Sequence, residues 1–109
     1  MKTYYHVTLK DNLESIMNYG LVPMLGKLSQ MCDEHLHRIY LFNNIDDMEI
    51  ALQSWLGEAI NEEFGENVMC CSLEIVLPDD FPISKGDVEY ESYSYITIPS
   101  QYIRYLKEE

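Results

Sequence analysis

The stretch TYYHVTLKDNLESIMNYGLVP, residues 3–23, carries the signals of a strand, a helix and a turn in succession. Its first six residues, TYYHVT, are rich in aromatic and β-branched side chains, which favour β-strands. Thr8 or Asp11 is the predicted N-cap of a helix, with Glu14 at the capping-box spacing from Asp11, and the apolar residues that follow recur at helical spacing up to Gly20. Glycine ends helices and proline cannot continue them, so the helix is predicted to stop at Gly20, shortly before Pro23.

The rest of the chain predicts an α+β fold. RIYLF at residues 38–42 predicts a second strand after a polar loop at residues 26–37. The nearly continuous apolar run VMCCSLEIVL at residues 68–77 predicts a central, buried strand. VEYESYSYITI at residues 88–98 alternates, which predicts a strand with its odd-numbered residues on one face, and residues 101–106 predict a short last strand.

A long amphipathic helix is predicted between the second and third strands. Asn44 or Asp46 caps its start, and Gly65 ends it. Its apolar side chains keep the i, i+3, i+4 spacing of one helix face: Met48, Ala51, Leu52, Trp55, Leu56, Ala59 and Ile60. Such a regular stripe is typical of a core-facing helix, so we expect Trp55 and Leu56 to be buried.

Length and composition predict one domain spanning residues 1–109. The chain is 47% hydrophobic and 24% charged, an ordinary balance for a folded protein, and its length leaves no room for a second core. No apolar stretch approaches the roughly 20 residues of a membrane span. The opening MKTYYHVTLKDN lacks the apolar core of a signal peptide. We therefore expect a soluble, cytoplasmic protein that does not enter membranes.

The cysteines fit a reducing compartment. Cys70 and Cys71 are neighbours on a predicted strand, where they point to opposite faces and are poor disulfide partners. Cys32, His35 and His37 form a Cys-x-x-His-x-His pattern. Zinc needs four well-placed ligands, and no second pair of ligands stands at a standard spacing, so we expect no metal site.

The charge of the chain indicates which partners it can have. With 19 acidic and 7 basic residues, the formal net charge is −12 at pH 7. Such a surface repels a phosphate backbone, so we expect no direct nucleic-acid binding. A basic protein surface is a more natural partner, although acidity also serves solubility alone.

Four segments resemble the ADP-ribosyltransferase superfamily. TYYHVTLKDNLESIMNYGLVP is similar to the family's first strand with its His or Arg, a helix of the form NL-x-x-I and a Gly-Leu turn. RIYLF resembles the second-strand segment with its Tyr, and SLEIVLPDDF resembles a mid-sheet strand ending in Pro and acidic residues. ESYSYITIPSQYI resembles the closing segment, where a Glu begins a strand that ends in Ile-Pro. The resemblance implies a small ADP-ribosyltransferase-like α+β domain, with mixed, mostly antiparallel sheets and two flanking helices around an NAD cleft.

The resemblance implies NAD-binding roles for residues of the first two strands. His6 corresponds to the family's first-strand His, which hydrogen-bonds the ribose next to adenine. The family pattern there is His-Gly-Thr, whereas this chain has His6-Val7-Thr8. The backbone of Val7 can still meet the nicotinamide carboxamide, although its side chain reduces close approach, and Thr8 would brace the turn. Tyr40 matches the Tyr that stacks on nicotinamide, where a π-face meets a cationic ring.

The resemblance also implies a catalytic carboxylate. Glu91, counted back from the pair Ile98-Pro99, stands where the family's Glu binds the ribose 2′-OH and stabilises the charge that develops as nicotinamide leaves. Glu89 and Tyr93 share its predicted face and are the alternatives for this position. If the resemblance holds, His6, Tyr40 and Glu91 converge on one cleft, on the same side of the sheet.

Each of these residues also has an ordinary explanation. A strand His or Tyr is commonly structural, and Glu89 and Glu91 on one face are typical of a solvated surface, where a Glu contributes little to folding. It is the joint appearance of His6, Tyr40 and Glu91, in order, that favours a site. No glycine-rich loop that could cradle phosphates is present.

The sequence therefore predicts an NAD-dependent mono-ADP-ribosyltransferase that modifies a macromolecular, preferably protein, acceptor. The alternative is a catalytically inert, acidic module of the same fold that occludes a basic protein surface, as would suit a phage or mobile-element protein directed against a host. A third activity, NAD-dependent removal of a terminal RNA phosphate, relies on several arginines in a related fold. This chain has only Arg38 and Arg104, which disfavours it.

Overall fold

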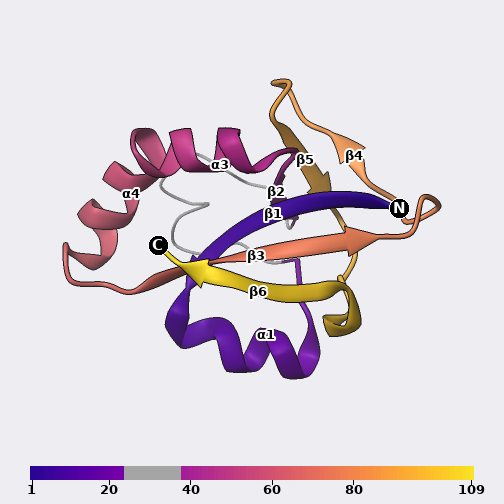
Figure 1. Ribbon diagram of the computed structural model, residues 1–109, viewed down its shortest axis with the longest axis horizontal. Coiled ribbons are helices and arrows are strands. Elements are labelled where there is room, and N and C mark those ends of the chain that lie inside the picture. Colours follow the sequence, from indigo (N-terminus) through magenta and orange to yellow (C-terminus); the bar gives the residue numbers. More distant parts are fainter. Residues whose placement is uncertain (24–37) are drawn as a thin grey trace.

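The computed structural model describes residues 1–23 and 38–109, which form one antiparallel sheet with helices on both faces (Figure 1). The α+β class is the one that the sequence predicts. The polar loop expected at residues 26–37, with Cys32 and the Cys32-His35-His37 pattern, lies outside the described residues.

The strand order in the sheet is β4-β5-β2-β1-β3-β6. In chain order the strands are β1 (Lys2–Leu9), β2 (Ile39–Phe42), β3 (Cys70–Leu77), β4 (Ser84–Lys85), β5 (Glu91–Ser94) and β6 (Ile103–Glu108). The α-helices are α1 (Leu13–Tyr19), α3 (Ile45–Leu52) and α4 (Trp55–Phe64), with 3₁₀ turns at Lys10–Asn12 and Ser100–Tyr102. All strand pairings of the described residues are antiparallel, and three α-helices rather than two flank them. For the described residues, this corrects the mixed sheet and the two helices that the resemblance implies, and the additional helix arises because the second predicted helix is divided into α3 and α4.

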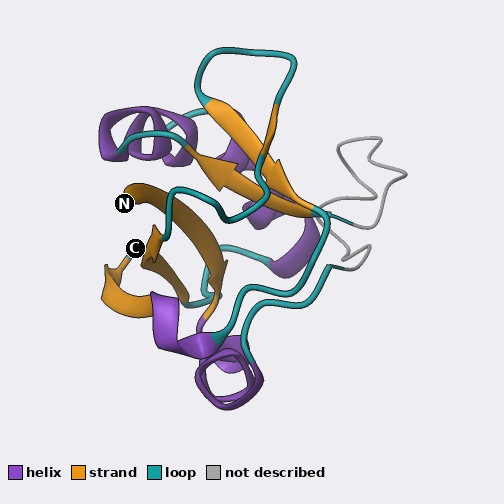
Figure 2. Ribbon diagram, turned by 90° about the vertical axis from the view of Figure 1, so that its right-hand side faces the viewer, coloured by secondary structure: helices purple, strands orange, loops and turns teal. Residues whose placement is uncertain are grey.

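The sheet consists of two groups of strands that are joined at one point. Strands β1 and β3 pair over eight positions, from Lys2 with Leu77 to Leu9 with Cys70. Strands β1 and β2 share the single paired position Tyr5 with Phe42. Figure 2 shows β2, β5 and β4 as a group separate from β1, β3 and β6. The strands β1 and β2 therefore diverge away from this pair.

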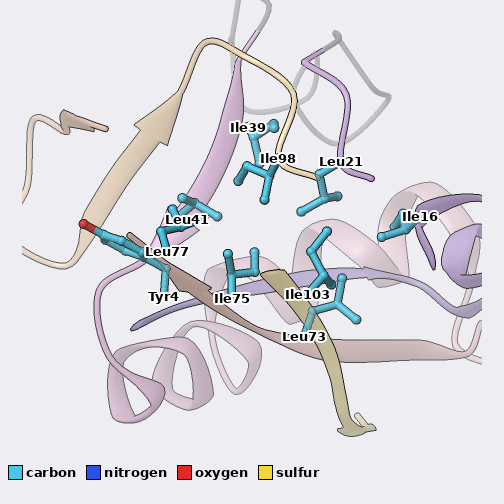
Figure 3. Close-up of a cluster of buried hydrophobic side chains, with 10 residues drawn as sticks. All are labelled: Tyr4, Ile16, Leu21, Ile39, Leu41, Leu73, Ile75, Leu77, Ile98 and Ile103. Carbon is cyan, nitrogen blue, oxygen red and sulfur yellow. The ribbon is translucent and has the colours of Figure 1, made fainter. Parts of the chain in front are cut away.

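Each face of the sheet has its own apolar core. The first cluster joins Ile16 of α1 to β1, β2, β3 and β6 through Tyr4, Ile39, Leu41, Leu73, Ile75, Leu77 and Ile103, together with Leu21 and Ile98 (Figure 3). The second cluster lies under α3 and α4 and consists of Phe42, Met48, Ala51, Leu56, Ile60 and Cys70. Alternation along β1 supplies both clusters, with Tyr4 on one side and Tyr5 on the other.

The long helix predicted from the apolar stripe is two helices, which corrects that expectation. Helix α3 ends at Leu52 and α4 begins at Trp55. A Cβ on Gly57 would lie 2.1 Å from the Leu52 carbonyl oxygen, so only glycine permits α4 to return this closely to the end of α3. The break changes the phase of the stripe: Leu56 is 8% exposed as expected, whereas Trp55 is 39% exposed. The expectation that Trp55 is buried is therefore wrong.

The strand predicted at residues 88–98 is also much shorter. Strand β5 ends at Ser94, whose hydroxyl donates to the carbonyl of Ile96 at 2.7 Å and so bends the chain. Beyond the bend, Ile98 pairs with Leu21 in an isolated bridge. A side-chain hydrogen bond therefore takes the place of the backbone hydrogen bonds that a longer strand would have made.

Among residues 1–23 and 38–109, none of the helices combines the length and the hydrophobicity that a membrane span needs.

Candidate functional site

Tyr40 and Glu91 lie on neighbouring strands and on the same face of the sheet. In the pairing of β2 with β5, Tyr40 is opposite Tyr93, and Phe42 is opposite Glu91. Directly paired residues project to one face, and residues two apart on a strand share a face. All four side chains therefore lie on the face covered by α3 and α4, where Phe42 is part of the second cluster and Tyr40 packs against it.

Glu91 is a buried carboxylate with several hydrogen-bond donors. It is 7% exposed, and its Oε1 accepts from the Tyr93 hydroxyl at 2.8 Å and from the Asp87 N–H at 2.9 Å. Burial by itself raises the pKa of Glu91, but hydrogen bonds from Tyr40, Tyr93 and the backbone of Asp87 and Val88 outweigh it, so the pKa lies below its usual 4.5. Glu91 is therefore ionised at neutral pH although it is inside the protein.

Aromatic rings surround this carboxylate. The ring centroid of Tyr40 lies 5.3 Å from that of Phe42, 5.4 Å from that of Tyr93 and 6.3 Å from that of Trp55. All three contacts have the edge-on geometry that aromatic pairs favour. The Arg38 guanidinium lies over the ring of Tyr93, 3.5 Å from its centroid, in a cation–π contact. Because Trp55 is partly exposed, it connects the aromatic group with the surface.

His6 is joined to this group through the backbone of β2. Its Nδ1 lies 2.7 Å from the carbonyl oxygen of Tyr40, and since a carbonyl only accepts, Nδ1 carries the proton. Burial lowers the pKa of His6, and the hydrogen bond to Tyr40 offsets this only in part. The ring is therefore neutral at pH 7 and bridges the two strands where they diverge.

The side chain of His6 does not share a face with Glu91. On β1, His6 is opposite Leu73 of the first cluster, whereas Glu91 is opposite Phe42 of the second. Alternation therefore directs the two side chains to opposite faces of the sheet. The structure brings Tyr40 and Glu91 together and leaves His6 on the other side, which corrects the expected common cleft. The cause is the separation of β1 from β2, which sequence periodicity does not reveal.

The structure also shows where the remaining predicted residues lie relative to Tyr40 and Glu91. Val7 packs against the second cluster, and Thr8 is half-buried on the opposite face of β1. Glu89 is exposed and precedes β5, while Tyr93 is buried and donates to Glu91. Of the three alternatives for the carboxylate position, burial and hydrogen bonding favour Glu91.

Sequence reasoning missed several residues of this group. It named Tyr93 only as a replacement for Glu91, although the spacing of two on one strand already indicated that the two side chains are neighbours. It assigned Trp55 to the core, and it used Arg38 only to disfavour RNA chemistry. No spacing signal indicated that Arg38 would lie over Tyr93, since that contact depends on the pairing of β2 with β5.

We predict that folding stability falls as the pH is lowered through the range in which His6 titrates. Its folded-state pKa lies below the usual 6.5, so the unfolded chain binds more protons and stability is lost as the pH falls below about 6.5. His6→Asn keeps a donor for the Tyr40 carbonyl but does not titrate. Urea midpoints at pH 7.5 and 5.5 should differ less for this variant than for the parent protein. Equal differences in the two proteins would contradict the prediction.

In the parts of the chain that the structure describes, no three His, Cys, Asp or Glu side chains are grouped so as to hold a metal ion, and Cys70 and Cys71 are free thiols. Neither a protein-family model nor a curated protein nor a solved structure matches this chain.

Proposed function

We propose that this protein transfers one ADP-ribose group from NAD to an acceptor on another macromolecule, with a basic protein as the preferred acceptor. The observation that carries the proposal is the ionised Glu91 carboxylate, 7% exposed and hydrogen-bonded by two tyrosines. Cleavage of the bond between nicotinamide and ribose develops positive charge on the ribose. A fixed carboxylate in a place with little water is suited to stabilise that charge.

Each side chain of the site has a separate role in this reaction. The C–N glycosidic bond breaks, its electron pair leaves with nicotinamide, and a nucleophile of the acceptor forms a bond to the same ribose carbon. Glu91 stabilises the positive charge at that carbon, and the Tyr40 ring offers its π-face to the cationic nicotinamide. His6 lies on the other face and acts as a positioning residue, because its hydrogen bond to the Tyr40 carbonyl fixes β2 relative to β1.

Binding of NAD to Glu91 needs a local rearrangement. The carboxylate already accepts hydrogen bonds from the Tyr93 hydroxyl and the Asp87 N–H. In the proposed complex, a ribose hydroxyl takes the place of one of these donors, so that the carboxylate remains hydrogen-bonded throughout.

A second candidate, the inert acidic binding module, is favoured by a different observation. Residues 39–84 contain ten Asp and Glu and no Lys or Arg, so α3, α4 and β3 all belong to a uniformly acidic half of the sequence. A field of one sign attracts a basic partner and speeds association. The separation of His6 from Glu91 also favours this candidate, since the complete set of three residues is not assembled on one face.

Thermal unfolding with excess NAD, combined with an assay for released nicotinamide, separates the two candidates. A ligand that binds only the folded state stabilises it by about 2.7 kcal/mol at 100 times its dissociation constant, so the transferase should melt at a higher temperature with NAD and release nicotinamide. A protein that shows neither effect at millimolar NAD is not a transferase. In that case, binding to a lysine-rich peptide should weaken when acids within residues 39–84 are replaced by Lys.

A further inference from the structure

A cavity of about 570 Å³ lies on the face of β5 opposite to Glu91. Its walls come from the start of β1, the residue after β2, the end of β3 with the segment that follows, and the two short strands β4 and β5. Ser92 lines the cavity, and because neighbouring strand residues point to opposite faces, the cavity and the Glu91 carboxylate are on different sides of the sheet. The volume is in the range of small-molecule sites.

Two of the few basic residues of this chain line the cavity. The protein has 7 Lys and Arg in total, and Lys2 of β1 and Lys85 of β4 both belong to this wall. Within residues 1–23 and 38–109, neither ammonium has a carboxylate at ion-pair distance. The carboxylate of Asp79, also in the wall, is paired with the amine of Met1 at 2.9 Å and feels the charge of Lys2 more weakly. In a protein of net charge −12, two unpaired cations beside one cavity are a local reversal of sign.

The hydroxyl of Tyr4 adds a further donor. Tyr4 is 8% exposed and belongs to the first apolar cluster, yet it also lines the cavity. Figure 3 shows its hydroxyl at the far end of the ring, pointing away from the cluster. Burial raises the pKa of Tyr4, so the phenol keeps its proton, and it has no hydrogen-bond partner among the described residues. The oxygen of this hydroxyl is not among the buried atoms that lack a partner, so it reaches the open space of the cavity, where a ligand can accept its hydrogen bond.

Asn43 and Ser92, two further polar residues of the wall, already have hydrogen-bond partners. Oδ1 of Asn43 accepts from the Ser92 hydroxyl at 2.6 Å, and Nδ2 of Asn43 donates to the Glu89 carbonyl at 2.6 Å. Next to this polar wall, Phe81 and Ile83 provide apolar surface, and both pack against the first cluster. The cavity thus combines positive charge, a free donor and an apolar side.

We propose that this cavity binds the oxyanion of a small molecule that also has a flat apolar part, of which a phosphate ester of an aromatic ring is the simplest case. The ammonium groups of Lys2 and Lys85 neutralise the phosphate, since lysine binds phosphate as a point charge. The Tyr4 hydroxyl donates to one phosphate oxygen, and the ring lies against Phe81 and Ile83. The site is independent of the proposed NAD reaction, because Glu91 is on the other face of β5.

Calorimetric titration of the full chain with phenyl phosphate at low salt tests this assignment, with inorganic phosphate as the second probe. We expect phenyl phosphate to bind more tightly than inorganic phosphate, because only the ester has the ring. The double variant Lys2→Gln, Lys85→Gln should weaken binding by about tenfold or more. Lys107→Gln, which removes a cation paired with Glu49 elsewhere, is the matched control and should change affinity by less than about twofold.

Tyr4→Phe supplies an independent test, because it removes only the hydroxyl and retains the ring in the cluster. Affinity should fall severalfold while the melting temperature of the free protein changes little, because the hydroxyl makes no hydrogen bond within the described residues that could be lost. Amide chemical shifts of Lys85 and Ser92 should move on titration. Equal weakening by Lys107→Gln and by the double variant, no binding at millimolar phenyl phosphate, or shift changes confined to other strands would each overturn the proposal.

Discussion

Replacing Glu91 by Gln is expected to lower the rate of NAD cleavage by about 10²–10³-fold, the loss seen when one preorganised electrostatic contact to a transition state is removed. Gln has nearly the same shape as Glu and keeps an oxygen that can accept from Tyr93. It lacks the negative charge that stabilises the ribose cation, so the effect should appear in the chemical step. Single-turnover release of nicotinamide at saturating NAD measures this step directly.

The matched control for this change is Glu89→Gln. Glu89 was an alternative for the carboxylate position, and it is exposed and precedes β5. Each variant removes one negative charge, and the two positions are close together in the sequence. A general effect of net charge on the rate should therefore affect both variants equally. Activity that is retained by Glu91→Gln and lost by Glu89→Gln would assign the carboxylate to the other residue. Full activity in both variants would remove the catalytic role of this strand.

Glu91→Gln should also lower the free energy of unfolding, by about 1–3 kcal/mol, which differs from the sequence-based expectation that an exposed Glu contributes little. The amide oxygen of Gln can still accept from the Tyr93 hydroxyl and the Asp87 N–H, but these hydrogen bonds lose their ionic partner, and the amide nitrogen cannot accept the hydrogen bond from Tyr40. Urea unfolding of both variants measures this cost, and Glu89→Gln should stay within about 0.5 kcal/mol of the parent. A loss of stability without any NAD turnover in the parent protein would favour the binding module.

The strands with a simple pattern were predictable from sequence. The aromatic and β-branched opening is β1 from Lys2 to Leu9, and the apolar run before Pro78 is β3, because a strand that is covered on both faces is mostly apolar. Predictions that used a long pattern went wrong where one local contact interrupts it. Gly57 allows the turn between α3 and α4, and the Ser94 hydroxyl ends β5 early.

The candidate site was predictable in part. Tyr40 and Glu91 each lie on a strand that the sequence predicts, and the pairing of β2 with β5 places them on the same face of neighbouring strands. The position of His6 was not predictable, because it depends on how β1 and β2 separate after the single pair Tyr5 with Phe42. The burial of Glu91 depends on the loop that carries Asp87 and on Tyr93, and alternation alone makes such a residue look exposed.

The replacement Gly20→Ala is expected to destabilise the fold by about 3–5 kcal/mol, the largest effect on stability that we predict. Gly20 follows α1 with φ +84° and ψ −177°, a conformation that is essentially restricted to glycine and costs other residues about 1–3 kcal/mol. A Cβ at this position would also lie 2.3 Å from the Ile98 carbonyl oxygen, so the backbone itself would have to move.

That movement would break a specific contact. Leu21 and Ile98 exchange two backbone hydrogen bonds, of 2.9 and 3.0 Å, and both side chains are buried in the first cluster at 6% and 0% exposure. This bridge fastens the end of α1 to the chain that follows β5, so separating it exposes apolar surface as well as backbone polar groups. The loss should therefore exceed the backbone strain of the alanine alone.

Gly65→Ala measures the backbone strain of an alanine without the steric clash that Gly20→Ala adds. Gly65 follows α4 with φ +88° and ψ 168°, close to the conformation of Gly20, but a Cβ there would meet nothing within 4 Å. We expect this variant to lose only about 1–3 kcal/mol in urea unfolding. The difference between the two variants then measures the contact between α1 and the segment after β5. If the two variants lose the same free energy of unfolding, backbone strain accounts for both losses. The shift of the backbone between Leu21 and Ile98 then costs no additional stability.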